Sequence, residues 1–119
     1  MSTARATWKA CERRIARMLG GVRVPVTGRA RGDAPDIAHP LWSIEVKLRT
    51  NRPAFLEHAM SQAKAAARGE QVPLVVVAAK SRDTRQAFVV MELGDFANYF
   101  GGGPGKDTTP QDGAEGDGT

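Results

Sequence analysis

The sequence predicts a mixed α/β protein of the α+β type, in which a central mixed β-sheet is flanked by helices. Three segments support this fold class. Residues 4–19 carry an apolar stripe with helical spacing, residues 42–48 alternate apolar and polar side chains, and residues 73–79 form an almost uninterrupted apolar run. These patterns are typical of a helix packed on one side, a half-buried strand and a strand covered on both faces.

The charge distribution divides the 119 residues into a basic domain over residues 1–100 and an acidic, Gly- and Asp-rich tail over 101–119. The chain has 17 basic and 13 acidic residues, a net charge of +4. The tail holds one lysine and four acids, so the domain carries +7. A basic domain of this size, with room for one core, indicates a polyanionic partner such as nucleic acid. The tail has no apolar anchor, and we expect it to be disordered.

Several function classes are excluded by composition. Cys11 is the only cysteine, so an internal disulfide and a zinc site built from cysteines are both impossible. His39 and His58 are not spaced as a metal-binding pair. No apolar run approaches the roughly 18 residues of a membrane span, and no signal-peptide segment is recognisable. We expect a cytoplasmic protein of a bacterium or of a phage-infected host, without a membrane partner.

The first predicted element is a helix from about Ala4 to Leu19, which Gly20 and Gly21 end before a short strand over 22–27. Glu12 lies at the margin of the apolar stripe of this helix. Such a carboxylate is either a solvated edge residue or faces the sheet, and helix geometry alone favours neither. If Glu12 faces the sheet, its charge needs a partner there, and a metal ion or Lys47 would serve.

The most informative stretch is the pair of segments 35–37 and 42–49, which we expect to form a hairpin. Successive side chains of a strand point to opposite faces, so Glu45 and Lys47 share one face. Asp36 lies at the end of the neighbouring segment. Two carboxylates and an ammonium group that converge at a strand edge can hold a divalent metal ion and the water that it activates, which is the chemistry of phosphodiester hydrolysis.

Magnesium is the cation that this donor set predicts, with manganese as a possible substitute, because hard cations are held by one or two carboxylates together with water and phosphate oxygens. Lys47 could hold the attacking water or offset the charge that develops on the phosphate. The alternative for Glu45 and Lys47 is an exposed ion pair without function. Asp33, in a predicted turn, competes for the role of Asp36; we favour Asp36 because it leads directly into a strand.

The second half of the sequence predicts a helix that Pro53 opens and Gly69 closes, then two strands and a short closing helix. Gln62 lies near the apolar face of the first of these helices. It could orient a water or a phosphate, or it could be an ordinary boundary residue. The four predicted segments are 53–68, 73–79, 86–91 and 92–100.

Basic side chains surround the predicted site in the sequence. We expect them to contact the DNA backbone, since such contacts neutralise phosphate charge without reading the base sequence. These candidates are Arg23, Arg29, Arg31, Lys47 and Arg49.

The pattern Pro35-Asp36…Glu45-Val46-Lys47 resembles the PD-(D/E)XK nuclease superfamily. With Glu12 in the first helix and the segment 23–28, Arg-Val-Pro-Val-Thr-Gly, it is similar to the archaeal-type Holliday junction resolvases of that superfamily. The similarity spans about Trp8 to Val77. It implies a restriction-endonuclease-like core and a symmetric homodimer that nicks four-way DNA junctions.

The resemblance also implies roles for single residues. Glu12, Asp36 and Glu45 would be the acidic metal ligands, and Lys47 the catalytic lysine. Gln62 corresponds to a glutamine that many superfamily members carry on the helix after the lysine strand. The resemblance further implies that Thr27, which stands where the resolvases usually carry serine, belongs with the DNA-binding residues.

The sequence therefore predicts a magnesium-dependent, structure-selective DNA endonuclease of DNA recombination and repair, and within that class a Holliday junction resolvase. Two alternatives stay open at this point. One is another nuclease of the superfamily, of the virus-type replication-repair (VRR-NUC) or restriction type. The other is a non-catalytic nucleic-acid-binding module of the same fold.

Overall fold

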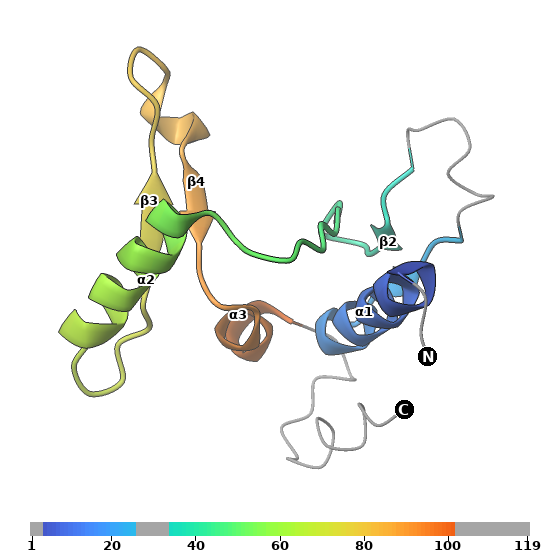
Figure 1. Ribbon diagram of the computed structural model, residues 1–119. Helices are drawn as coiled ribbons and strands as arrows, with labels where there is room; N and C mark the ends of the chain where they lie inside the picture. The colour runs from blue at the N-terminus through green and yellow to red at the C-terminus, as the bar shows by residue number, and fades with distance from the viewer. Residues whose placement is uncertain (1–3, 26–33, 102–119) are drawn as a thin grey trace. The chain divides into compact units, whose positions relative to one another are not determined.

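The computed structural model describes residues 4–25 and 34–101 and combines three α-helices with short antiparallel strands (Figure 1). Two compact units make up the chain, one of residues 1–48 and 97–119 and the other of residues 49–96. The predicted tail, apart from Gly101, lies outside the described residues, and so does the loop 28–33. None of the helices in the described ranges is long and apolar enough to cross a membrane.

In the first unit, the chain begins with helix α1 (Ala4–Leu19), which confirms the predicted bounds. Gly20 ends the helix because its φ of 75° is a left-handed conformation that glycine adopts without a Cβ penalty. Its N–H and that of Gly21 donate to carbonyl groups of the last helical turn, at 3.4 and 2.9 Å. The inward side of α1 buries Ala16 and Leu19.

Strands β1 (Val22–Arg23) and β2 (Ile37–Ala38) pair antiparallel directly after this helix. Ile37 is fully buried and also forms an isolated bridge with Ile44, so β2 lies between β1 and the segment around Ile44. Gly21 approaches β2 so closely that a Cβ there would lie 2.7 Å from the Ala38 carbonyl oxygen. The predicted strand over 42–49 therefore contributes one bridge rather than a full ladder.

The second unit contains helix α2 (Ala54–Ala66), which contacts strand β3 (Val75–Val77). Pro53 starts the helix as predicted, and its carbonyl oxygen accepts the N–H groups of the first turn. The helix ends two residues before the predicted Arg68, because Ala67 is already extended. Gly69, with φ of 56°, forms the turn that follows.

Strand β3 pairs antiparallel with β4 (Phe88–Val90), and a short 3₁₀ helix, η2 (Thr84–Gln86), lies between them. Helix α3 (Leu93–Phe100) closes the described chain, one residue shorter than predicted. The predicted combination of helices and strands is thus confirmed. Within the described residues, however, the strands form two separate two-stranded antiparallel sheets and not the single mixed sheet that we expected.

The prediction that residues 73–79 form a strand covered on both faces is wrong within the second unit. Val75 and Val77 are half-buried, whereas Leu74 and Val76 are exposed and the cross-strand neighbour of Val76, Val89, is exposed as well. The cause is that a two-stranded ladder with one helix against it is covered on one face only. An uninterrupted apolar run does not distinguish this arrangement from a fully covered strand.

Candidate active site

Asp36 is positioned by its main chain and its side chain together. Its N–H donates to the Ile44 carbonyl oxygen at 2.9 Å, and its carbonyl oxygen accepts the Val24 N–H at 2.9 Å. The carboxylate oxygen Oδ2 accepts the N–H of Val46 at 2.7 Å. The side chain is buried, with 4% of the residue exposed. This carboxylate is therefore fixed beside the residue that separates Glu45 from Lys47.

Glu45 and Lys47 lie on the same side of their segment, as the alternation predicted. Lys47 Nζ is 3.6 Å from Glu45 Oε2, and both side chains are more than half exposed. The apolar residues between and around them, Ile44 and Val46, are half-buried. An exposed ion pair contributes little to folding stability. The two charged ends are thus accessible to an incoming ligand, and the residue between them, Val46, donates its backbone N–H to Asp36.

Glu12 faces inward, which decides between the two alternatives that the sequence left open. Its side chain is fully buried, and Arg23 Nε donates to its Oε1 at 2.7 Å. The ion pair joins α1 to β1, and the Arg23 guanidinium also lies 6.0 Å from the centre of the Trp8 ring. The partner of Glu12 that the structure describes is therefore Arg23, whereas Lys47 pairs with Glu45.

This pairing differs from the prediction from the sequence, in which Arg23 contacts DNA. The Arg23 side chain is only 16% exposed, and its Nη2 is buried with no hydrogen-bond partner among the described residues. A signal for the pairing existed, because Arg23 is on the strand that directly follows the helix of Glu12. A buried carboxylate requires a cation or hydrogen-bond donor nearby.

The remaining predicted site residues are distributed over the chain. Gln62 is exposed on α2, and Arg49 is exposed at the start of the second unit. Four further candidates lie outside the described residues: Thr27, Arg29, Arg31 and Asp33.

The metal-binding capacity of the site rests on two carboxylates. In residues 4–25 and 34–101, no group of three or more His, Cys, Asp or Glu side chains is arranged to hold a metal ion. Asp36 and Glu45 nevertheless provide hard oxygen donors, the type that Mg²⁺ accepts together with water and substrate phosphate. His39 has a turn role instead, since its Nδ1 accepts the Leu41 N–H at 3.0 Å.

Comparison of the chain with known protein families, with curated proteins and with solved structures gives no match. The resemblance to the PD-(D/E)XK nucleases therefore rests on the sequence motifs alone.

Proposed function

We propose that this protein is a magnesium-dependent, structure-selective DNA endonuclease, and specifically a Holliday junction resolvase of the PD-(D/E)XK type. The observation that carries the proposal is the hydrogen bond from the Val46 N–H to Asp36 Oδ2. It brings the aspartate to the Glu-x-Lys segment, where Glu45 and Lys47 form their ion pair. An acidic pair can hold a hard divalent cation, and an adjacent lysine can stabilise the negative charge that develops on the phosphate.

Asp36 and Glu45 would hold the metal ion, which supplies Lewis-acid activation of the phosphate and of the attacking water when it is bound. The hydrogen bond to Val46 fixes Asp36, so one ligand is preorganised and the other, the exposed Glu45, is free to adjust to the substrate. Lys47 is placed to donate to the attacking water or to a phosphate oxygen whose negative charge increases.

The same proposal includes the fold, the oligomeric state and the DNA partner of the protein. The fold would be a restriction-endonuclease-like core, and the functional form a cytoplasmic homodimer that places one site on each of two strands. Its partner would be branched DNA, to which the net charge of +7 on residues 1–100 is complementary. Glu12 as a third ligand, and Gln62 as a residue that orients water, remain predictions.

The experiment that tests the proposal incubates the protein with labelled four-way junction, flap and linear duplex DNA, with and without Mg²⁺. We expect metal-dependent nicking with preference for the junction. Asp36→Ala and Glu45→Ala should each abolish nicking and leave junction binding in place, because the basic residues remain. Glu70→Ala, which removes an exposed acid from a turn of the second unit, is the matched control. Full cleavage by both site variants would refute the assignment.

A second candidate function is a nucleic-acid-binding module without catalysis. It is supported by the net charge of +7 on residues 1–100, which favours a polyanionic partner whether or not the protein is catalytic. This alternative predicts junction binding that falls steeply with salt and no nicking with either Mg²⁺ or Mn²⁺. A nick that appears with metal and disappears in Asp36→Ala excludes it.

A further inference from the structure

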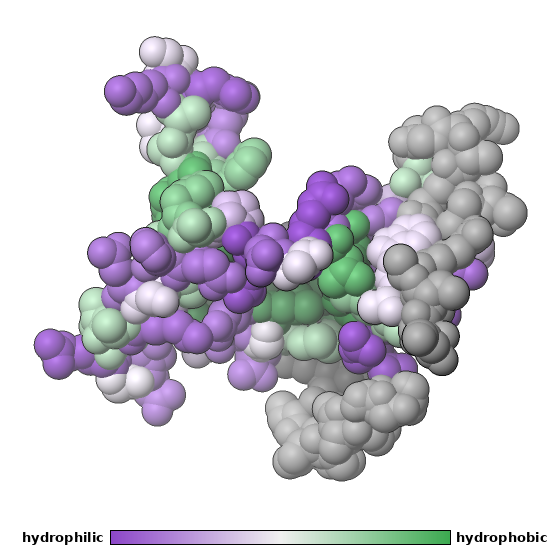
Figure 2. All heavy atoms as spheres, in the orientation of Figure 1, coloured by the Kyte–Doolittle hydropathy of each residue, from purple (hydrophilic) through white to green (hydrophobic). Residues whose placement is uncertain are grey.

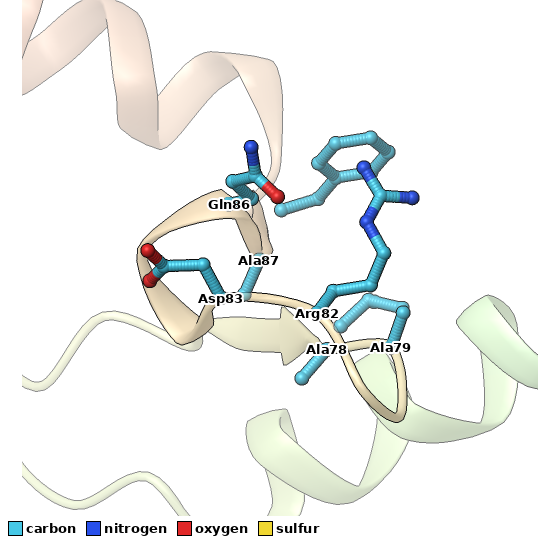
Figure 3. Close-up of a pocket in the computed structure, with 8 residues that line it drawn as sticks. Ala78, Ala79, Arg82, Asp83, Gln86 and Ala87 are labelled. Atoms are coloured by element: carbon cyan, nitrogen blue, oxygen red, sulfur yellow. The ribbon is translucent and has the colours of Figure 1, made fainter.

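The β3–β4 hairpin of the second unit ends in the loop 78–87, which encloses a hollow of about 160 Å³ (Figure 3). Small side chains form part of its lining, among them Ala78 and Ala87, and leave room beside the strand ends. The longer side chains at its border come from Arg82, Gln86 and Phe88. Figure 2 shows a polar tip (purple) beyond an apolar stem (green) in this hairpin.

The charges of this loop leave two cations free for an external partner. Its three basic residues outnumber its one acid, Asp83. Asp83 is occupied by Arg85, which donates to it from Nη2 at 2.8 Å, from Nε at 3.2 Å and from its backbone N–H at 2.9 Å. Lys80 and Arg82 are exposed, and neither forms an ion pair with a residue in the described ranges.

An aromatic ring, that of Phe88, lines the same hollow as Arg82. Phe88 is 73% exposed, although water is an unfavourable environment for a phenyl ring. Figure 3 shows the side chains of Arg82 and Gln86 extending to the same side of the loop, whereas Asp83 points away from them. The tip thus presents a guanidinium, an amide and an exposed ring at one hollow, and the carboxylate of Asp83, which also lines the hollow, is paired with Arg85.

We propose that the hairpin tip binds a single-stranded or unpaired nucleotide of DNA. Arg82 and Lys80 contact the backbone phosphates, a base stacks on Phe88, and the Gln86 amide forms hydrogen bonds with the base edge. Aromatic stacking next to a basic groove is the general mode of single-strand binding. The identification of the polyanion as DNA rests on the proposed function. The presence of Arg82, Lys80, Phe88 and Gln86 in this hairpin is independent of it.

Fluorescence anisotropy with a labelled oligothymidine and a duplex of equal length, both without metal, tests this inference. Phe88→Ala is expected to weaken single-strand binding by about fivefold or more, the loss of one stacked base. Phe88→Trp is expected to keep the affinity, and its fluorescence should be quenched on binding. Val89→Ala removes a neighbouring exposed side chain from the opposite face of β4 and is the matched control, with unchanged affinity.

Charge variants complete the test. Arg82→Ala should lower the slope of log affinity against log salt concentration by about one, while Arg68→Ala, an exposed arginine of the turn after α2, should leave binding unchanged. Wild-type affinity in Phe88→Ala, with its thermal melt preserved, overturns the inference. The inference is also overturned if an acidic peptide displaces the oligonucleotide equally well from the wild-type protein and from Phe88→Ala.

The two proposals fail separately. If the wild-type protein cleaves junctions but Phe88→Ala binds single strands normally, only the hairpin inference is wrong. If no cleavage is found with any metal but Phe88→Ala binds weakly, only the nuclease proposal is wrong. The double variant Asp36→Ala/Glu45→Ala, which cannot cleave under the proposed function, should bind oligothymidine as the wild type does.

Discussion

The two units of the chain differ in what they bury. The buried residues in the ranges 7–25 and 34–101 all belong to the first unit, and two of them, Glu12 and Asp36, are acids. The second unit, residues 49–96, has no fully buried residue. Its helix α2 and ladder β3–β4 bury apolar surface only in part. The first unit therefore places charge in its interior, and the second keeps all its charge at the surface.

This difference identifies the first unit as the region in which buried polar side chains are held by hydrogen bonds. A buried carboxylate destabilises a fold unless hydrogen-bond donors satisfy it. Both buried acids of this unit have such donors: Arg23 for Glu12, and the Val46 N–H for Asp36. The second unit has no comparable constraint, so its polar residues are free to serve at the surface. The predictions that follow test the contrast, from the largest expected effect to the smallest.

Loss of one partner of the buried ion pair should have the largest effect. Glu12→Ala leaves Arg23 largely buried without its carboxylate and should lower the free energy of unfolding by about 3–5 kcal/mol. Urea denaturation measures this change. The control is Glu12→Leu combined with Arg23→Met, which removes both charges and should cost far less. A loss below about 1 kcal/mol in Glu12→Ala would show that the pair is not a structural support.

The apolar positions of the two units should respond unequally. Ile37→Ala creates a cavity at a fully buried position and should destabilise the protein by about 2–5 kcal/mol. Val76→Ala, at a position that is 58% exposed, should change stability by no more than about 0.5–1 kcal/mol. Equal effects in urea denaturation would mean that the exposed face of β3 is covered in solution, and the contrast between the units would be lost.

Loss of Asp36 and loss of Glu45 should have different effects on stability, although the proposed function requires both residues for cleavage. Asp36→Ala leaves the Val46 N–H without its acceptor and should cost about 1–3 kcal/mol. Glu45→Ala removes an exposed partner and should stay within about 0.5 kcal/mol of wild type. Thermal melts in the absence of metal measure both. A destabilised Glu45→Ala would contradict its description as an accessible ligand.

The smallest effect concerns pH and the hairpin tip. The side-chain hydrogen bond from Arg85, and then its backbone N–H, lower the pKa of Asp83 below its usual value of 3.8, and Asp83 in turn raises the pKa of Arg85. Because the pKa of Asp83 is lowered in the folded protein, the stability that its contact with Arg85 contributes is fully present above pH 3.8. It is lost as the pH falls through the lowered pKa. NMR titration of the Asp83 carboxyl should give a midpoint below 3.8 that rises towards it in Arg85→Ala.

Much of the local structure could be predicted from the sequence. Periodicity and glycine signals gave the bounds of α1, and the alternation around Glu45 correctly placed it beside Lys47. What could not be predicted depends on contacts between distant segments. Whether the apolar run at β3 is covered on one face or two depends on which segments pack against it, and whether Glu12 pairs with Arg23 or Lys47 depends on how α1 meets the strands. Neither appears in a local pattern.

For the candidate site, the sequence predicted the residue types and the shared face of Glu45 and Lys47. It did not predict how Asp36 reaches them, because a hydrogen bond from a side chain to the backbone N–H of Val46 leaves no mark in composition or spacing. The exposed ring of Phe88 was missed for a related reason. A phenylalanine in a predicted strand is expected to face a core. The register pairs Phe88 with the half-buried Val77, so Phe88 is exposed because it lies at the ladder's end and not because it is on the outer face.

The close approach at Gly21 has a consequence for recognising distant relatives of this chain. Any side chain there would collide with β2 and displace the strand that begins next to Asp36. A homologue with another residue at this junction would need a different distance between its first helix and its acidic strand. Glycine at this junction therefore constrains the spacing between the first helix and the acidic strand, which the short acidic motif alone does not record.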